Sequence, residues 1–196
     1  MSVRSSRMRI SLALATLIVV AFGLVIADNG PNHQVRTQSF GSSGGNINDI
    51  SKAFCCSGTL GSLVKDSSSV QYILSNNHVL ARMDQAASGE DISQPGLIDN
   101  NCRPGAIVGD FSVAPHAGTN VDAALAALRS GMMDSTGAIL DVGVPNSTPA
   151  AATVNATVAK SGRTTGLTCG PVQSTNTSVK VQYQQGCNQG KKFTIT

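Results

Sequence analysis

The sequence contains no tryptophan, two tyrosines and a single glutamate, Glu90, and charged residues make up 13% of the chain. Residues that favour helices are therefore scarce, whereas glycine, serine, threonine, asparagine and valine are plentiful. This composition, with short alternating apolar segments between turn residues, favours an all-β fold. No cluster of basic residues interleaved with aromatic residues occurs in the sequence, which argues against nucleic acid as a partner.

Positive charge is concentrated at the N-terminus. Arginines there precede an apolar run over residues 10 to 26, and small residues follow before the chain turns polar at Asp28. This order predicts a secretory signal peptide over residues 1 to 27. An uncleaved signal-anchor is the alternative, and only then would the membrane be a partner. In both cases the net charge of +3 reflects targeting, and the rest of the chain is secreted or periplasmic.

Five cysteines in an exported chain predict disulfides. The adjacent Cys55 and Cys56 are not expected to bond with each other, because that bridge strains the peptide between them. We expect Cys102 to pair with one of these two, and Cys169 to pair with Cys187. One thiol is then left over.

Turn residues divide the exported part into segments. Residues 28 to 50 are polar and turn-rich, and we expect them to be a flexible lead-in. Residues 51 to 141 hold the segments of a first β-barrel, including a glycine-punctuated strand over residues 54 to 64 that can bend around a barrel corner. Residues 152 to 196 are predicted to form part of a second barrel. They hold fewer strands than the roughly six of a closed small barrel, so we expect this barrel to be incomplete.

Two side chains carry the chemical interest. His78 follows an apolar segment and a Ser-Asn-Asn turn, and both a structural and a general-base role fit this position. Asp122 precedes an apolar run in VDAALAAL, whose propensity is compatible with a short helix that has Asp122 in its first turn. Together they form a stronger hypothesis, because an aspartate that orients a histidine makes the ring an effective base for a hydroxyl nucleophile. Asp110 is the reserve candidate for the acid.

Three segments resemble the trypsin-like serine peptidases, in the order found in that family. Residues 57 to 81, SGTLGSLVKDSSSVQYILSNNHVLA, resemble the strand–turn–strand–histidine motif, especially that of the bacterial high-temperature-requirement type. Residues 121 to 128 resemble the motif around the catalytic aspartate. Residues 158 to 172, VAKSGRTTGLTCGPV, resemble the stretch that opens the second barrel of streptogrisin-type and α-lytic proteases. As a whole, residues 53 to 196 resemble bacterial peptidases related to the plant narrow-leaf protein.

This resemblance implies a chymotrypsin-like double β-barrel that cleaves a protein or peptide substrate bound between the barrels. It also implies that VDAALAAL is a strand, despite its helical propensity. His78 would be the general base and Asp122 would orient its ring. No cofactor or metal is expected. The other histidines, His33 and His116, lie in polar turn-like segments without the short spacing of zinc ligands, and we expect them to be solvated.

The sequence departs from the family at the nucleophile. The family carries its serine in a G-D-S-G motif, which is absent here. The formal G-x-S-x-G at residues 41 to 45 lies before the histidine in the lead-in, and we do not expect it to be a nucleophile elbow. Ser57, Ser75 and Ser161 are expected to be strand-corner and turn residues. We therefore expect the serine beyond residue 196, in a truncated chain that is inactive as it stands. The alternative is a non-catalytic exported binding protein, a pseudo-protease, on the same fold.

Overall fold

The computed structural model describes a large part of the chain, namely residues 35, 38–51, 53–115, 120–182 and 192–195. All of them belong to residues 32 to 196, one of the two units into which the chain divides. The expected signal peptide lies outside the described residues, as do His33, His116 and Cys187. Within the described part, no helix has the length and apolar character needed to cross a membrane.

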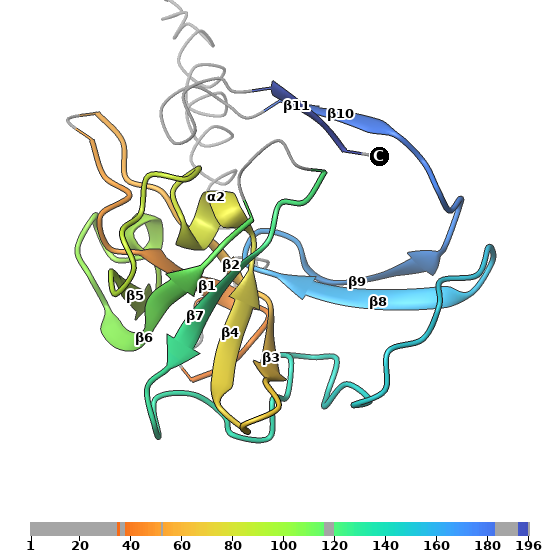
Figure 1. Cartoon of the computed structure of the whole chain (residues 1–196), viewed down its shortest axis with the longest axis horizontal. Coiled ribbons are helices and arrows are strands. Elements are labelled where there is room, and N and C mark those ends of the chain that lie inside the picture. Colours follow the sequence, from red (N-terminus) through yellow and green to blue (C-terminus); the bar gives the residue numbers. More distant parts are fainter. Residues whose placement is uncertain (1–34, 36–37, 52, 116–119, 183–191, 196) are drawn as a thin grey trace, which may run out of the picture. The chain divides into compact units, whose positions relative to one another are not determined.

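The fold is all-β, as predicted, and the helices among the described residues, α2 and η2, are single turns (Figure 1). In chain order the elements are β1 (Ser42–Asn46), β2 (Gly58–Leu60), β3 (Ser62–Lys65), β4 (Gln71–Ser75), α2 (Asn77–Leu80), β5 (Asp91–Gln94), η2 (Leu97–Asp99), β6 (Ala106–Val113), β7 (Ala124–Leu128), β8 (Thr157–Gly162), β9 (Gly166–Pro171), β10 (Val179–Gln182) and β11 (Lys192–Ile195).

Seven strands form one antiparallel sheet in the order β2-β1-β5-β6-β7-β4-β3. The two outermost strands, β2 and β3, are consecutive in the chain and are separated by Gly61 alone. The backbone N–H of Gly61 donates to the carbonyl of Leu74 at 3.0 Å. A Cβ at this position would lie 2.8 Å from the same carbonyl oxygen, so only glycine fits the corner. The sheet is thus a nearly closed barrel joined by a bent strand, and the predicted glycine bend is confirmed.

Alternation along the strands fills the barrel. In β4, Ile73 and Ser75 are buried while Tyr72 and Leu74 are partly exposed, as expected when successive side chains point to opposite faces. The buried cluster draws on five strands of the sheet, β2, β4, β5, β6 and β7, and on α2. It comprises Phe40, Leu60, Ile73, Val79, Leu80, Ala81, Ile92, Val108, Phe111, Ala124, Ala126 and Met133.

The expectation of a flexible lead-in over residues 28 to 50 is wrong for its described C-terminal part. Strand β1 is buried along its whole length and pairs with β2 and with β5. The reason is close packing, because a Cβ at Gly44 would lie 2.4 Å from the side chain of Leu60. The same glycine and serine residues that predict a loop by composition are here the ones small enough for the barrel interior.

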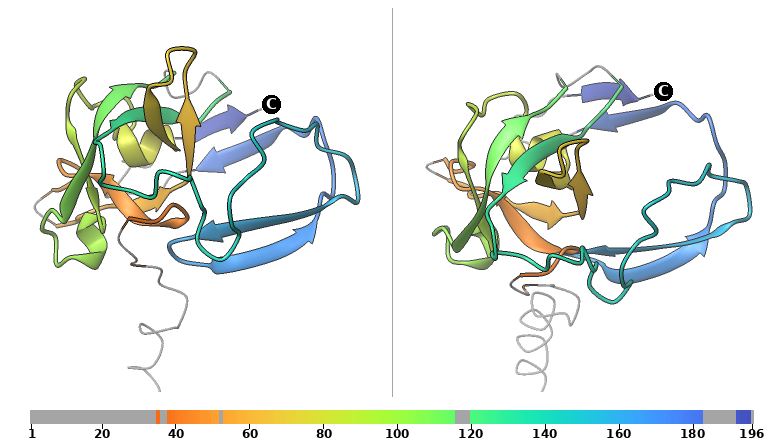
Figure 2. Two further views of the ribbon diagram at one scale, coloured as in Figure 1. Left: turned by 90° about the horizontal axis from the view of Figure 1, so that it is seen from below. Right: turned by 60° about the horizontal axis from the view of Figure 1, so that its bottom comes forward.

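The second half of the chain holds two separate hairpins. Strand β8 pairs with β9 over six residue pairs, and β10 pairs with β11 over four (Figure 2). Within the described residues these hairpins share no strand with each other or with the barrel. The expected second barrel therefore stays a prediction.

The turn of the β8–β9 hairpin is attached to the barrel by a largely buried ion pair, the Arg163–Asp99 junction. Arg163 donates from Nε to Asp99 Oδ2 at 2.8 Å and from Nη2 to Oδ1 at 2.5 Å. The side chains are 15% and 6% exposed, respectively. The Ser43 hydroxyl donates to Asp99 Oδ2, and the Arg163 backbone N–H donates to Thr59 Oγ1. A carboxylate this deeply buried requires such compensation.

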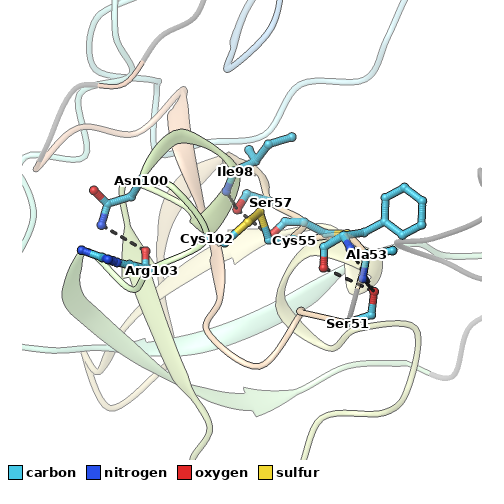
Figure 3. Close-up of a disulfide and its surroundings, with 10 residues drawn as sticks. Ser51, Ala53, Cys55, Ser57, Ile98, Asn100, Cys102 and Arg103 are labelled. Carbon is cyan, nitrogen blue, oxygen red and sulfur yellow. Dashed lines mark hydrogen bonds between the residues drawn. A yellow bond between two sulfur atoms is a disulfide. The ribbon is translucent and has the colours of Figure 1, made fainter.

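A disulfide joins Cys55 to Cys102, which confirms the expectation that Cys102 bonds with one of the adjacent pair (Figure 3). It links the loop before β2 to the loop after η2, and it fits an oxidising compartment. Cys56 is also disulfide-bonded. The predicted pairing of Cys169 with Cys187 is wrong, because Cys169 is an exposed free thiol on β9 whose cross-strand neighbour is Ala159.

Candidate active site

His78 is positioned by the end of β4 and by α2. Asn76 is extended, with φ of −76° and ψ of 151°, and the chain then makes the single helical turn of α2. Val79 and Leu80 are buried in the core and anchor this turn to the barrel. His78 lies between these anchored residues and the strand end, with its side chain 30% exposed. Core packing on both sides thus holds the imidazole at the barrel surface.

Asp122 is brought to the same place by the pairing of β4 with β7. The last pair of that antiparallel ladder is Ser75 with Ala124, so the end of β4 lies beside the start of β7. His78 is the second residue of α2, three residues after Ser75, and Asp122 lies two residues before the start of β7. The strand implied by the family resemblance is confirmed, and the helix predicted from propensity is wrong. Pairing on both sides, with β4 and with β6, outweighs the helical preference of alanine and leucine.

The two side chains are in direct contact. Asp122 Oδ2 lies 2.6 Å from His78 Nδ1, and Asp122 Oδ1 accepts the backbone N–H of His78 at 3.2 Å. The aspartate side chain is 15% exposed. An ionised carboxylate can only accept hydrogen bonds, so the Nδ1 atom carries the ring proton. In the neutral ring the lone pair then lies on Nε2, which is the tautomer that a general base requires.

Two asparagines next to His78 brace this pair, and sequence reasoning treated both only as turn residues. Asn76 Nδ2 donates to the backbone carbonyl of Asp122 at 2.9 Å. Asn77 is completely buried, and its Nδ2 donates to Asp84 Oδ1 and to the carbonyl of Pro115, both at 2.8 Å. Its Oδ1 atom accepts the backbone N–H of Asp84. The sequence signal that could have indicated this role is the pair of consecutive asparagines directly before the histidine.

Charged groups near the ring form a local network. Burial raises the pKa of Asp49 from 3.8 to about 6, although the positive charges of Arg82 and of protonated His78 act in the opposite direction. Arg82 donates to both carboxylate oxygens of Glu90. Burial by itself would raise the pKa of Glu90, but the hydrogen bonds from Arg82 and from the backbone of Ala87 outweigh it and lower that pKa. The carboxyl of Asp49, whose pKa burial raises, thus interacts electrostatically with His78.

The reserve acid, Asp110, is engaged elsewhere. It lies in β6 and forms a bidentate pair with Arg129, at 3.0 Å from Nε and 2.6 Å from Nη2. Arg129 also donates to Asp91 at 2.7 Å. The hydrogen bond from Arg129 holds the pKa of Asp110 below its usual range. Asp110 therefore belongs to a surface charge cluster, and Asp122 is the acid that contacts His78.

The serines considered in the sequence all bond to the main chain of the barrel. Ser75 Oγ donates to the Thr59 carbonyl, and Ser161 Oγ donates to the Gly41 carbonyl. Ser57 Oγ donates to the carbonyl of Cys56 and accepts the N–H of Ile98. Ser57 precedes β2 and Ser75 ends β4, as expected of strand-corner residues, whereas Ser161 lies within β8 and not in a turn.

The G-x-S-x-G stretch at residues 41 to 45 is largely the buried strand β1. Ser43, at its centre, is completely buried and donates to Asp99. A nucleophile elbow presents its serine at an exposed strand-to-helix turn, and this stretch does not.

The described residues contain no group of three or more histidine, cysteine, aspartate or glutamate side chains that could hold a metal ion. The chain was also compared with known proteins. No family model matches the sequence, and no curated protein matches it either.

Proposed function

We propose that this chain is part of an exported serine endopeptidase and supplies the acid–base half of a Ser-His-Asp triad. The observation that carries the proposal is the contact of Asp122 with both the ring and the backbone N–H of His78. The all-β barrel and the disulfide support the same conclusion, because this barrel type and an oxidising compartment suit such a peptidase. The resemblance of the flanking motifs to trypsin-like peptidases supplies the substrate class, protein or peptide.

The mechanism follows from the tautomer. His78 Nε2 takes the proton of a serine hydroxyl as the oxygen attacks the substrate carbonyl, and the ring becomes an imidazolium. Asp122 stabilises that positive charge from the Nδ1 side and keeps the ring from rotating. The imidazolium then returns the proton to the departing amine. Backbone N–H groups beside the serine would bind the oxyanion, a contribution of about 3–4 kcal/mol. In this proposal, both the serine and these N–H groups come from sequence that follows residue 196.

The test is made on the product of the complete reading frame. We expect a serine within a G-D-S-G motif after residue 196 and 1:1 labelling by a serine-directed phosphonate probe. His78→Ala and Asp122→Asn should each lower peptide hydrolysis by about 10⁴-fold. Asp110→Asn removes an aspartate from the same barrel without touching His78, and it should leave hydrolysis unchanged. A reading frame without such a serine, or full hydrolysis by the His78→Ala protein, would favour the non-catalytic binding protein instead.

A further inference from the structure

The connection between β6 and β7 carries Asp122, and two neighbouring side chains fasten it at both of its described ends. Asn77 donates to the carbonyl of Pro115, shortly after β6, and Asn76 donates to the carbonyl of Asp122, shortly before β7. Both asparagines belong to the segment that leads into His78. The residue that presents the base and the connection that presents the acid are therefore tied together by consecutive amides.

The two ties differ in their surroundings. Asn77 is completely buried and also bonds with Asp84, so it belongs to the core structure of the turn after α2. Asn76 is exposed. Its side chain can therefore be altered without leaving a cavity or a buried polar group, and such variants are expected to fold.

Asn76 acts where the strand ladder ends. The last β4–β7 pair joins Ser75 to Ala124, so Asp122 lies two residues beyond the end of this ladder. The Asn76 amide extends the attachment past that pair by bonding the Asp122 main chain at 2.9 Å. The carboxylate must meet two donors at once, the Nδ1 of His78 and its backbone N–H, so a small shift of the Asp122 main chain would break at least one contact.

We propose that Asn76 is a positioning residue for the acid of the triad: it holds the main chain of Asp122 so that both carboxylate oxygens reach His78. The inference rests on the proposed function for its catalytic consequence. Its structural part, the coupling of the Asn76 amide to the His78–Asp122 contact, can be measured without any enzymatic activity.

The experiment compares three variants with the unmodified full-length protein. Asn76→Ala removes the donor, Asn76→Asp keeps the shape but removes the donor, and Asn76→Ser retains a shorter donor. The first readout is the proton NMR signal of His78 Nδ1–H, which is strongly deshielded and slow to exchange while the carboxylate accepts it. We expect this signal to broaden and exchange faster in the Ala and Asp variants, and to be partly restored in the Ser variant.

The second readout is peptide hydrolysis. In this proposal Asn76 acts on the acid and not on the substrate, so losing its hydrogen bond to the main chain of the acid should lower kcat about 5- to 10-fold with KM unchanged. Asn100→Ala is the matched control. Asn100 also donates from its side-chain amide to backbone carbonyls, those of Arg103 and Pro104, in a surface turn after η2. This variant should keep both the NMR signal and kcat.

The outcomes separate the two proposals. If His78→Ala abolishes hydrolysis while Asn76→Ala and Asn76→Asp keep the unmodified signal and kcat, the positioning role of Asn76 is refuted and the protease assignment stands. If His78→Ala retains full hydrolysis, the protease assignment is refuted, and the NMR comparison alone decides whether Asn76 sets the geometry of the pair.

Discussion

Replacing Arg163 with methionine removes two charge-assisted hydrogen bonds from Asp99, whose side chain is 6% exposed. Methionine keeps most of the apolar length of the arginine, so the change mainly deletes the guanidinium. The carboxylate stays in its buried position beside Ser43 without the charge that compensated its removal from water. Breaking a buried pair in this way costs about 3–5 kcal/mol, and we expect a loss of stability in that range.

Arg129→Met is the matched control. Arg129 also forms a bidentate pair with an aspartate, Asp110, but the two side chains are 41% and 37% exposed. Exposed pairs contribute about 1 kcal/mol or less, because water solvates the carboxylate that remains. The two variants lose the same guanidinium group, so the difference between their losses of unfolding free energy reports how deeply the partner aspartate is buried.

Urea denaturation of the unmodified protein and both variants gives the free energies of unfolding, with unchanged m-values as the check that the unfolding transition is the same. Adding Asp99→Asn to the Arg163→Met protein should recover part of the loss, because a neutral amide is cheaper to bury than a carboxylate. An Arg163→Met protein that loses no more stability than Arg129→Met would show that the Arg163–Asp99 junction is solvated and would refute the reasoning.

Three other predictions concern stability. The native pKa of Asp49, about 6, exceeds its ordinary value of 3.8, so the folded protein holds a proton that the unfolded chain releases between these values. The free energy of unfolding should therefore fall as pH rises from about 4 to about 6. Asp49→Asn should abolish this fall and add about 1–2 kcal/mol at pH 7, a range that allows for the partial exposure of the carboxyl. Thermal unfolding of both proteins across this pH range is the measurement. Replacing Cys55 and Cys102 together with serine should cost about 2–4 kcal/mol in urea denaturation, because the loop they close is long. Gly61→Ala should cost about 1–3 kcal/mol in the same assay, since its Cβ would meet the Leu74 carbonyl.

Each of these three has its own control. For Asp49, unmodified and variant proteins whose stabilities run parallel from pH 4 to pH 7 would show that the carboxyl does not titrate in this interval. For the disulfide, the unmodified protein and the double serine variant should be equally stable once both are fully reduced, because reduction also breaks the bond of Cys56 in each of them. For Gly61, the comparison is Gly170→Ala on the β8–β9 hairpin, where a Cβ meets nothing within 4 Å. Equal losses at both glycines would mean that the barrel corner tolerates a side chain.

Patterns of a few neighbouring residues in the sequence predicted only those structural features that depend on the same neighbouring residues. The glycine-bent strand follows from Gly61 and its flanking apolar residues. The turn predicted from the polar residues before His78 is wrong, because Ser75 ends β4, Asn76 is extended and Asn77 begins α2. The contact between His78 and Asp122 was reached through the family resemblance, because nothing in the spacing of the two residues by itself requires them to meet. The catalytic role of the pair stays a prediction.

Long-range packing accounts for the failures. The Gly-Ser stretch of β1 has the composition of a loop, and only the neighbouring Leu60 side chain explains why small residues form a buried strand there. Residues 124 to 128 prefer a helix in isolation, and two flanking strands override that preference. The disulfide predicted between Cys169 and Cys187 was wrong, because the spacing of cysteines in the sequence does not determine which thiols meet in three dimensions.

The one-residue corner at Gly61 has a consequence for self-association. Because β2 and β3 are a single bent strand, the described part of the barrel offers no long lateral row of unpaired N–H and C=O groups at which a strand from a second molecule could add. In other proteins a covering helix or a charged edge strand prevents such strand addition, and here the continuous main chain at Gly61 has that effect. A proteolytic nick beside Gly61 would separate these two outermost strands, each of which has one side without a strand partner in this sheet, and we expect the nicked protein to polymerise through its sheets more readily.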